Sequence, residues 1–222
     1  ALALNVTGNV ALTVTGLASS TIKTVDLSAA TKMVDVTGIT VAATGATFIA
    51  GAGGSKIAGG AGVDTITGGV GADTINGNGG ADVIVGGGGA DKITGGTGAD
   101  KITLSGSTST LVFTAGHSGT NSSTTFQTAE LTTTLDVVFG ATAGTKVDLT
   151  GLVNASTNYF STELTRAGTN LAGADDMVVF ARGTYDAAAG TFTYAANGLD
   201  SVMTYDATVG AGTAFESVVM VG

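Results

Sequence analysis

Residues 59–103 read GGAGVDTIT, GGVGADTIN, GNGGADVIV, GGGGADKIT and GGTGADKIT, five nonapeptides in one unbroken phase. Each opens with a glycine-rich run, carries an aspartate at its sixth position and an isoleucine at its eighth. The aspartates stand nine residues apart and are Asp64, Asp73, Asp82, Asp91 and Asp100. Five consecutive matches to one phase are not a chance event, even in a chain with 37 glycines. The segment therefore repeats one structural unit.

Each nonapeptide combines a turn with a very short strand. Glycine is favoured where the chain turns through positive φ, so the first six residues of a unit predict a turn. The last three, such as Thr-Ile-Thr, are strand formers in which only the central isoleucine points to one side. Two units make one coil of 18 residues, and the coils stack into an all-β fold, a flattened right-handed parallel β-solenoid or β-roll. Isoleucines then line both inner faces, with Ile66, Ile84 and Ile102 on one and Ile75 and Ile93 on the other.

The same stacking places the aspartates in two columns. Asp64, Asp82 and Asp100 form one column, and Asp73 and Asp91 form the opposite one. Neighbouring strands lie about 4.8 Å apart. Calcium takes oxygen ligands at about 2.3–2.6 Å, so an ion fits between carboxylates one coil apart. Without an ion, each column is a ladder of like charges that disfavours the compact state. Because the core is one residue thick, we expect folding and calcium occupancy to be one equilibrium.

The consensus of the five units, GGxGxDxIx, resembles the RTX calcium-binding nonapeptide repeat of type I-secreted bacterial proteins. The resemblance implies that about three to five Ca²⁺ ions bind between the turns, in shells of about six oxygen atoms. It assigns metal binding to the five aspartates and to residues of the turns before them. These turn residues are Gly60, Gly62, Gly69, Gly71, Asn78, Gly80, Gly87, Gly89, Gly96 and Gly98. Asn78 stands where the other units have glycine, which is tolerable since asparagine also enters the left-handed region.

The repeat weakens one unit beyond each end. Upstream, Ser55 takes the aspartate position while Ile57 keeps the core position; downstream, Ser109 and Leu111 do the same. Complete aspartate pairs one coil apart are therefore 64/82, 82/100 and 73/91, whereas 55/73 and 91/109 are half-sites whose occupancy stays open. Asp82 is then the only aspartate with a complete neighbour on both sides, so we expect its loss to affect two ions.

Two metal-free alternatives compete with this interpretation, a glycine-rich linker and a metal-free β-solenoid. A linker would not hold aspartate and isoleucine in a fixed phase. A metal-free solenoid has no reason to stack carboxylates. We therefore interpret the segment as a calcium-binding roll.

Composition argues against several other functions. The chain has no cysteine for disulfides or thiolate metal centres, and one histidine, His117, cannot form a multi-histidine zinc centre. The sequence Gly116-His-Ser-Gly around it is not a nucleophile elbow. No metalloprotease helix or phosphate-loop motif occurs, and we expect no enzyme activity. The net charge of −9 argues against binding to nucleic acids or anionic membranes. No run approaches the ~18 apolar residues of a membrane span.

Residues 1–50 predict further solenoid coils stacked under the calcium roll. Strand-like bursts such as Ala11-Leu-Thr-Val-Thr recur every eight to eleven residues. Asp26 and Asp35 lie within such bursts rather than in glycine turns, so we interpret them as solvated face residues and not as ligands. The chain opens on Ala1 inside a strand-like pattern, and we expect it to be a piece of a longer protein.

Residues 110–222 predict a β-rich C-terminal cap after the calcium roll of residues 51–109. Leu111-Val-Phe-Thr-Ala-Gly, Leu135-Asp-Val-Val-Phe and Lys146-Val-Asp-Leu-Thr-Gly resemble the cap that follows RTX repeats. The final residues, Phe215-Glu-Ser-Val-Val-Met-Val-Gly, are similar to an uncleaved type I secretion signal and equally fit a last β-strand.

Taken as a whole, the sequence resembles RTX-bearing surface-layer (S-layer) proteins of bacteria. Abundant Thr, Ala and Gly, only eight Lys and Arg, and solenoid on both sides of the roll favour this class. The resemblance implies export of the unfolded chain by a type I ABC exporter, folding on extracellular calcium, and assembly with copies of itself into a cell-surface lattice. Two alternatives share the roll: the C-terminal secretion and folding module of an exported protease or lipase, and the C-terminal region of a large adhesin.

Overall fold

The computed structural model describes residues 2–18, 21–105, 108–114, 120–121, 136–141, 145–151, 159–164, 177–186, 188, 191–194, 199–206 and 215–221. Within these ranges every regular element is a β-strand, and no helix is present that could cross a membrane. His117 and the acidic pair Asp175-Asp176 lie outside the described residues.

The strands form two sheets. The path of the first sheet is β1 (Leu2–Asn5), β3 (Ile22–Asp26), β5 (Thr47–Ile49), β7 (Thr65–Thr67), β9 (Val83–Val85), β11 (Lys101–Thr103), β14 (Asp136–Phe139), β20 (Phe215–Val221), β19 (Asp200–Asp206), β17 (Met177–Asp186) and β16 (Tyr159–Leu164), with β13 (Thr120–Asn121) against β20 and β18 (Thr191–Tyr194) against β17. The second is β15 (Lys146–Gly151), β12 (Thr110–Thr114), β10 (Lys92–Thr97), β8 (Thr74–Gly79), β6 (Ser55–Ala58), β4 (Val34–Thr40) and β2 (Leu12–Ala18).

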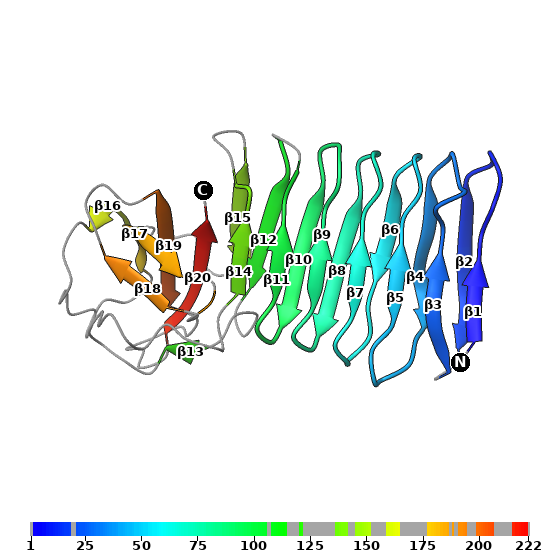
Figure 1. Ribbon diagram of the computed structural model, residues 1–222, viewed down its shortest axis with the longest axis horizontal. Coiled ribbons are helices and arrows are strands. Elements are labelled where there is room, and N and C mark those ends of the chain that lie inside the picture. Colours follow the sequence, from blue (N-terminus) through cyan, green and yellow to red (C-terminus); the bar gives the residue numbers. More distant parts are fainter. Residues whose placement is uncertain are drawn as a thin grey trace.

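Successive strands alternate between the two sheets, which is the topology of a β-solenoid. From β1 to β12 every odd-numbered strand joins the first sheet and every even-numbered strand joins the second, and all neighbours are parallel. The coils lie side by side along the long axis of the molecule, with the N-terminus at one end (Figure 1). The predicted all-β, parallel β-solenoid fold is thereby confirmed.

The core follows the predicted 18-residue register. Ile66 lies opposite Ile84, and Ile84 opposite Ile102, in the first sheet. Ile57, Ile75 and Ile93 align in the same way in the second sheet. All six isoleucines are at most 1% exposed. Each strand of the roll thus contributes one isoleucine to a core that is one residue thick on each side, which is why the pattern Thr-Ile-Thr needs only its central residue to be apolar.

The glycine runs differ on the two edges of the roll. On one edge the strands stay three residues long, as in β7 and β9, and the glycines form turns as predicted. On the other edge β8 and β10 continue into the glycine run, where Gly96 pairs with Asn78 and Thr97 with Gly79. The expectation that the first six residues of every unit are only a turn is therefore wrong on this edge. Turns that stack one coil apart bring their backbones to the spacing of neighbouring strands, so they can pair as strands do. Asn78 takes the left-handed conformation (φ 73°), as expected.

The stack is continuous across both predicted boundaries of the calcium roll. β5 pairs with β7 and β4 with β6 across residue 50, and β10 pairs with β12 across residue 109. The strands before residue 51 therefore extend the same two sheets. The three-part division of the chain stays a prediction, because no break in the stack marks it.

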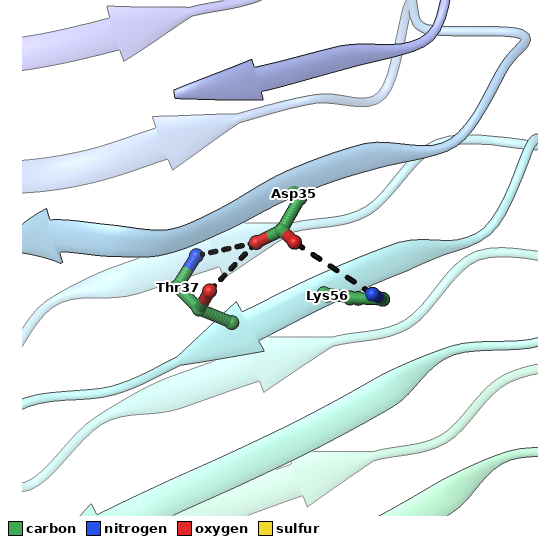
Figure 2. A network of polar contacts seen from close by, with 3 residues as sticks. All are labelled: Asp35, Thr37 and Lys56. Carbon is green, nitrogen blue, oxygen red and sulfur yellow. Dashed lines mark hydrogen bonds and ion pairs between the residues drawn. The ribbon is translucent and has the colours of Figure 1, made fainter. Parts of the chain in front are cut away.

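Asp35 lies on the outer face of the upstream coils. Its Oδ1 accepts hydrogen bonds from the backbone N–H (3.0 Å) and hydroxyl (2.7 Å) of Thr37, and its Oδ2 lies 3.8 Å from Nζ of Lys56 on β6 (Figure 2). Asp26 Oδ1 likewise accepts the N–H of Ser28 at 2.9 Å. Both carboxylates are engaged by nearby residues on the sheet surface, which agrees with their interpretation as face residues.

The C-terminal strand continues the first sheet beyond the solenoid. β20 runs parallel to β14 and antiparallel to β19, and Gly140 N–H donates to the carbonyl of Val221 at 3.1 Å. Val218 and Val219 are fully buried. Of the two interpretations left open for Phe215–Val221, the structure shows the β-strand; the secretion signal stays a prediction.

The close stacking of turns makes a prediction about two adjacent glycines. Gly89 has φ 94°, and a Cβ there would stand 2.6 Å from the carbonyl oxygen of Gly71 one coil away. A Cβ on Gly88 meets nothing closer than Val70 Cα at 3.4 Å, an ordinary contact. Gly89→Ala should therefore cost at least about 1–2 kcal/mol from backbone conformation alone, measured as a lower urea midpoint in saturating calcium. Gly88→Ala is the control; equal loss in both variants would contradict the stacking of these turns.

Candidate calcium sites

The five repeat aspartates sit just before the strands of the roll and point inward. Their exposed fractions are 0–2%. The strand pairing sets Asp64, Asp82 and Asp100 one coil apart on one edge of the roll and Asp73 and Asp91 one coil apart on the other. These are the two columns predicted from the 18-residue coil.

Four of the five repeat aspartates bind the backbone of the preceding coil through Oδ1, whereas Oδ1 of Asp73 is buried without a hydrogen-bond partner. Asp82 Oδ1 accepts the N–H of Asp64 at 2.8 Å, and Asp100 Oδ1 accepts the N–H of Asp82 at 2.8 Å. In the other column Asp91 Oδ1 accepts the N–H of Asp73 at 3.0 Å. The aspartate therefore fixes the register between coils, because a slip of one residue would break every bond in the column.

The second carboxylate oxygen is less well satisfied. Asp64 Oδ2 accepts the N–H of Gly60 at 2.6 Å and Asp73 Oδ2 accepts that of Gly69 at 2.9 Å. The Oδ2 atoms of Asp82 and Asp100 are buried and make no hydrogen bond. A buried polar atom without a hydrogen-bond partner destabilises the folded state. A bound ligand next to these oxygens would remove that destabilisation.

The glycine at the start of each turn leaves room beside these oxygens. A methyl group on Gly59 would overlap both Asp64 Oδ2 and the carbonyl oxygen of Gly77 in the next coil. A methyl group on Gly77 would overlap Asp82 Oδ2 and the carbonyl oxygen of Gly95. In the other column the same space at Gly68 is bounded by Asp73 Oδ2 and the carbonyl oxygen of Gly86. Each space thus lies between a carboxylate oxygen of one coil and a carbonyl oxygen of the next.

This donor set fits a hard, oxygen-seeking cation. No group of three or more His, Cys, Asp or Glu side chains comes together within the described ranges, so a bound ion would need backbone carbonyls beside one or two carboxylates. Calcium accepts such mixed shells and varied geometry, whereas magnesium demands a tighter octahedron. Calcium would supply the positive charge that the buried columns lack.

The predicted turn residues lie where they can contribute carbonyls, although some carbonyls already accept hydrogen bonds. In five turns, a Cβ added to a glycine would meet a carbonyl oxygen of the turn one coil before. The pairs are Gly80 with Gly62, Gly87 with Gly69, Gly89 with Gly71, Gly96 with Asn78, and Gly98 with Gly80. The carbonyl of Gly60 accepts the N–H of Gly79 at 3.2 Å, and that of Gly69 accepts the N–H of Gly88 at 2.9 Å. Asn78 also ties two turns together, because its Nδ2 donates to the carbonyl of Gly59 at 2.6 Å.

Burial raises the pKa values of all five repeat aspartates, and like charges add to the rise for Asp73 and Asp82. The pKa of Asp82 rises to about 7, mainly through burial and further through the charges of Asp100 and Asp64. The pKa values of Asp73 and Asp100 rise to about 6, also chiefly through burial. Burial raises the pKa of Asp64 and Asp91 as well. The middle of the longer column is therefore the place where a metal-free carboxylate is least stable.

At the ends of the columns other residues take the aspartate position. Ser109 Oγ accepts the N–H of Asp91 at 3.2 Å, so serine can make the coil-to-coil bond without a charge. Ser55 is buried at the corresponding upstream position. The N–H of Ala46, one coil before Asp64, donates to Asp64 Oδ1 at 2.6 Å.

Asp136 occupies the next position of the longer column and was missed by the sequence analysis. β14 pairs with β11, and Asp136 Oδ1 accepts the N–H of Asp100 at 2.8 Å. Asp136 is fully buried. The statement that Asp82 alone has acidic neighbours on both sides is therefore wrong, because Asp100 lies between Asp82 and Asp136. The signal was the spacing: Asp136 follows Asp100 by 36 residues, two coil lengths, and is followed by Val138 as a repeat aspartate is by isoleucine.

The raised pKa values predict that acid stabilises the metal-free roll. A folded carboxyl whose pKa exceeds its unfolded value binds more protons than the unfolded chain, so its contribution is present at low pH and is lost as pH rises through the folded pKa. For Asp82 this window runs from about pH 4 to about pH 7. Metal-stripped protein should show more β-structure by circular dichroism at pH 4.5 than at pH 7.5. Asp82→Asn should reduce this difference, and a β-signal that falls on acidification would contradict the prediction.

Replacement of single aspartates should rank them by position in the column. Asp82→Ala degrades the spaces shared with Asp64 and Asp100, whereas Asp73→Ala degrades one complete pair and one half-site. We expect Asp82→Ala to raise the calcium midpoint of folding more than Asp73→Ala, followed by circular dichroism in a calcium titration. A larger shift for Asp73→Ala or Asp91→Ala would show that the column pairing does not describe the ion sites.

Comparison with known protein families agrees with this geometry. The RTX calcium-binding nonapeptide repeat (4 copies) matches residues 45–75 and again residues 76–107. The matched residues include all five repeat aspartates, and Asp136 lies beyond them. A search of curated proteins finds no match. Residues 45–107 are therefore RTX calcium-binding nonapeptide repeats.

Proposed function

We propose that this chain is the calcium-dependent structural region of a bacterial surface-layer protein. The observation that carries the proposal is the position of the repeats within a longer solenoid. Strands β1 to β4 precede them and β12, β14 and β15 follow them in the same two sheets. A roll that only helps a neighbouring enzyme to fold does not need such flanking coils. In a lattice protein, by contrast, the flanking coils lengthen the structural unit from which the lattice is assembled.

In this proposal calcium converts an exportable chain into a rigid one. Buried carboxylates with raised pKa values make the roll unstable where calcium is scarce, as in cytosol. An unfolded chain can be threaded through a type I exporter. Outside the cell, calcium at about millimolar concentration reaches the weak end of the range for extracellular calcium modules and folds the roll. RTX repeats occur in secreted proteins, and the proposed location is the extracellular cell surface.

The proposed partner is a second copy of the chain. At a net charge of −9, neighbouring copies repel unless cations lie between them. Calcium would then act twice, inside the roll and between subunits. Candidates for the second role are the acidic residues outside the repeats, Asp175, Asp176, Asp186, Asp200 and Asp206. The role proposed for the chain is structural rather than enzymatic, with no nucleic acid and no inserted membrane as partner.

The second candidate is the secretion and folding module of an RTX protease, lipase or adhesin. The observation in its favour is that the family match falls on the repeats, residues 45–107, which such modules share. Such a module would bind calcium and fold in the same way. It would not assemble into ordered sheets.

Calcium titration separates the two candidates. Contacts between subunits lack the stacking within one chain that raises effective concentration. Lowering calcium should therefore dissolve an assembly, seen by light scattering, before it unfolds the roll, seen by circular dichroism. Electron microscopy of the calcium-loaded protein should show ordered sheets, and magnesium should not replace calcium. If no assembly forms at any calcium concentration while the roll still folds, the secretion module becomes the better proposal.

A further inference from the structure

The junction between the repeats and the C-terminal cap reproduces the geometry of the repeat columns. β14 pairs with β11 in the register that β11 keeps with β9, so Val138 follows Ile84 and Ile102 in the core. Asp136 lies just before the core position, as each repeat aspartate does. The bond from Asp100 N–H to Asp136 Oδ1 is 2.8 Å, the same as the two bonds that join Asp64, Asp82 and Asp100.

Asp100 supplies an independent observation at this junction. It is 1% exposed, and its Oδ2 has no hydrogen-bond partner. That oxygen lies against Gly95, the first residue of its own turn. In the two preceding coils the same oxygen borders the space that is closed by a carbonyl of the next coil. Asp100 thus holds an oxygen without a hydrogen-bond partner at the position where Asp64 and Asp82 border a space shared with the next coil.

Lys101, the cation next to Asp100 in the sequence, does not neutralise Asp100. Lys101 is exposed, and its Nζ stands 5.4 Å from the ring centroid of Phe139 on the outer side of the sheet. The buried Oδ2 of Asp100 is therefore left without a hydrogen-bond partner, which disfavours the folded state unless a cation binds it.

We propose that Asp100 and Asp136 hold a further calcium ion, outside the matched repeats, that locks the C-terminal cap onto the roll. Carbonyls of the turn at residues 95–98 would complete the shell on one side. The site rests on calcium binding by the repeats and is independent of the lattice role. It raises the number of complete acidic pairs from three (64/82, 82/100 and 73/91) to four.

The consequence of the site is that the cap becomes calcium-dependent although it contains no glycine–aspartate repeat. β14 pairs with β20 through four parallel residue pairs. β20 in turn pairs with β19, and β19 pairs with β17. An ion that fixes Asp136 therefore fixes the strand on which the C-terminal part of the first sheet is assembled.

The chain provides a reporter for this coupling. It has no tryptophan, and its four tyrosines, Tyr159, Tyr185, Tyr194 and Tyr205, all follow Asp136. Tyrosine emission therefore reports on the cap, while far-ultraviolet circular dichroism reports on all strands. Bound calcium per chain can be counted by equilibrium dialysis with radioactive calcium.

Two variants of Asp136 test the site. Asp136→Asn keeps an oxygen for the N–H of Asp100 but removes the charge. Asp136→Ser copies the end of the other column, where Ser109 accepts the N–H of Asp91. Both should bind one calcium ion fewer than the unaltered chain, and their tyrosine transition should move to higher calcium. The matched control is Asp26→Asn, an outer-face carboxylate bonded to Ser28, which should change neither.

The outcomes distinguish this site from the wider proposals. If either Asp136 variant binds as many ions as the unaltered chain, Asp136 is only a hydrogen-bond acceptor and the proposal is overturned. Fewer than four tightly bound ions in the unaltered chain would overturn it even if neither variant folds. A chain that binds no calcium at all would instead refute calcium binding by the repeats, and a chain that keeps the ion count without forming sheets would refute only the lattice role.

Discussion

Repulsion between buried carboxylates is the constraint on which the rest of the structure depends. The same residue type behaves in opposite ways inside and outside the solenoid. On the outer face, the hydroxyl of Thr37 lowers the pKa of Asp35, a solvated group. Inside, burial and two like neighbours raise the pKa of Asp82 to about 7. The roll thus stacks charges where they are least stable, and its core of one isoleucine per strand is too thin to offset that cost alone. We therefore expect a chain built in this way to fold or unfold with its cation supply.

The glycines follow from the same arrangement. Turns that share ions must approach at strand spacing, and at that distance a side chain on Gly87, Gly89 or Gly98 would meet a carbonyl of the neighbouring turn. Asn78 is the informative exception. Its φ of 73° is tolerable for asparagine, and its amide donates to Gly59 in the coil before. The repeats therefore require an aspartate, an isoleucine and a backbone without side chains, and the rest of each unit is free to vary.

Most of the roll could be predicted from its sequence because one period controls everything in it. The nine-residue phase gave the coil length, the isoleucine faces and the aspartate columns, and the register of Ile66 with Ile84 follows from it directly. Two features could not be predicted so easily. The nine-residue period is the same on both edges, so it cannot show that strands continue into the glycine run on one of them, where Gly96 pairs with Asn78. Asp136 was missed because the glycine run that marks a repeat does not precede it, and only the strand pairing shows that it completes the column.

The step of 36 positions from Asp100 to Asp136 shows how this architecture can grow. Thr110 pairs with Lys146 at the same doubled spacing, so both sheets resume after an insertion equal to one coil. The register of a solenoid is preserved only when an insertion adds a whole number of coils. Segments that add a multiple of 18 residues leave every column in place, whereas a gain of nine would exchange the two sheets and the two columns. Tandem duplication of a coil, or the excursion of one coil from the stack, is thus a neutral change of length, and surface features can be inserted at any turn without disturbing the ion sites on either side.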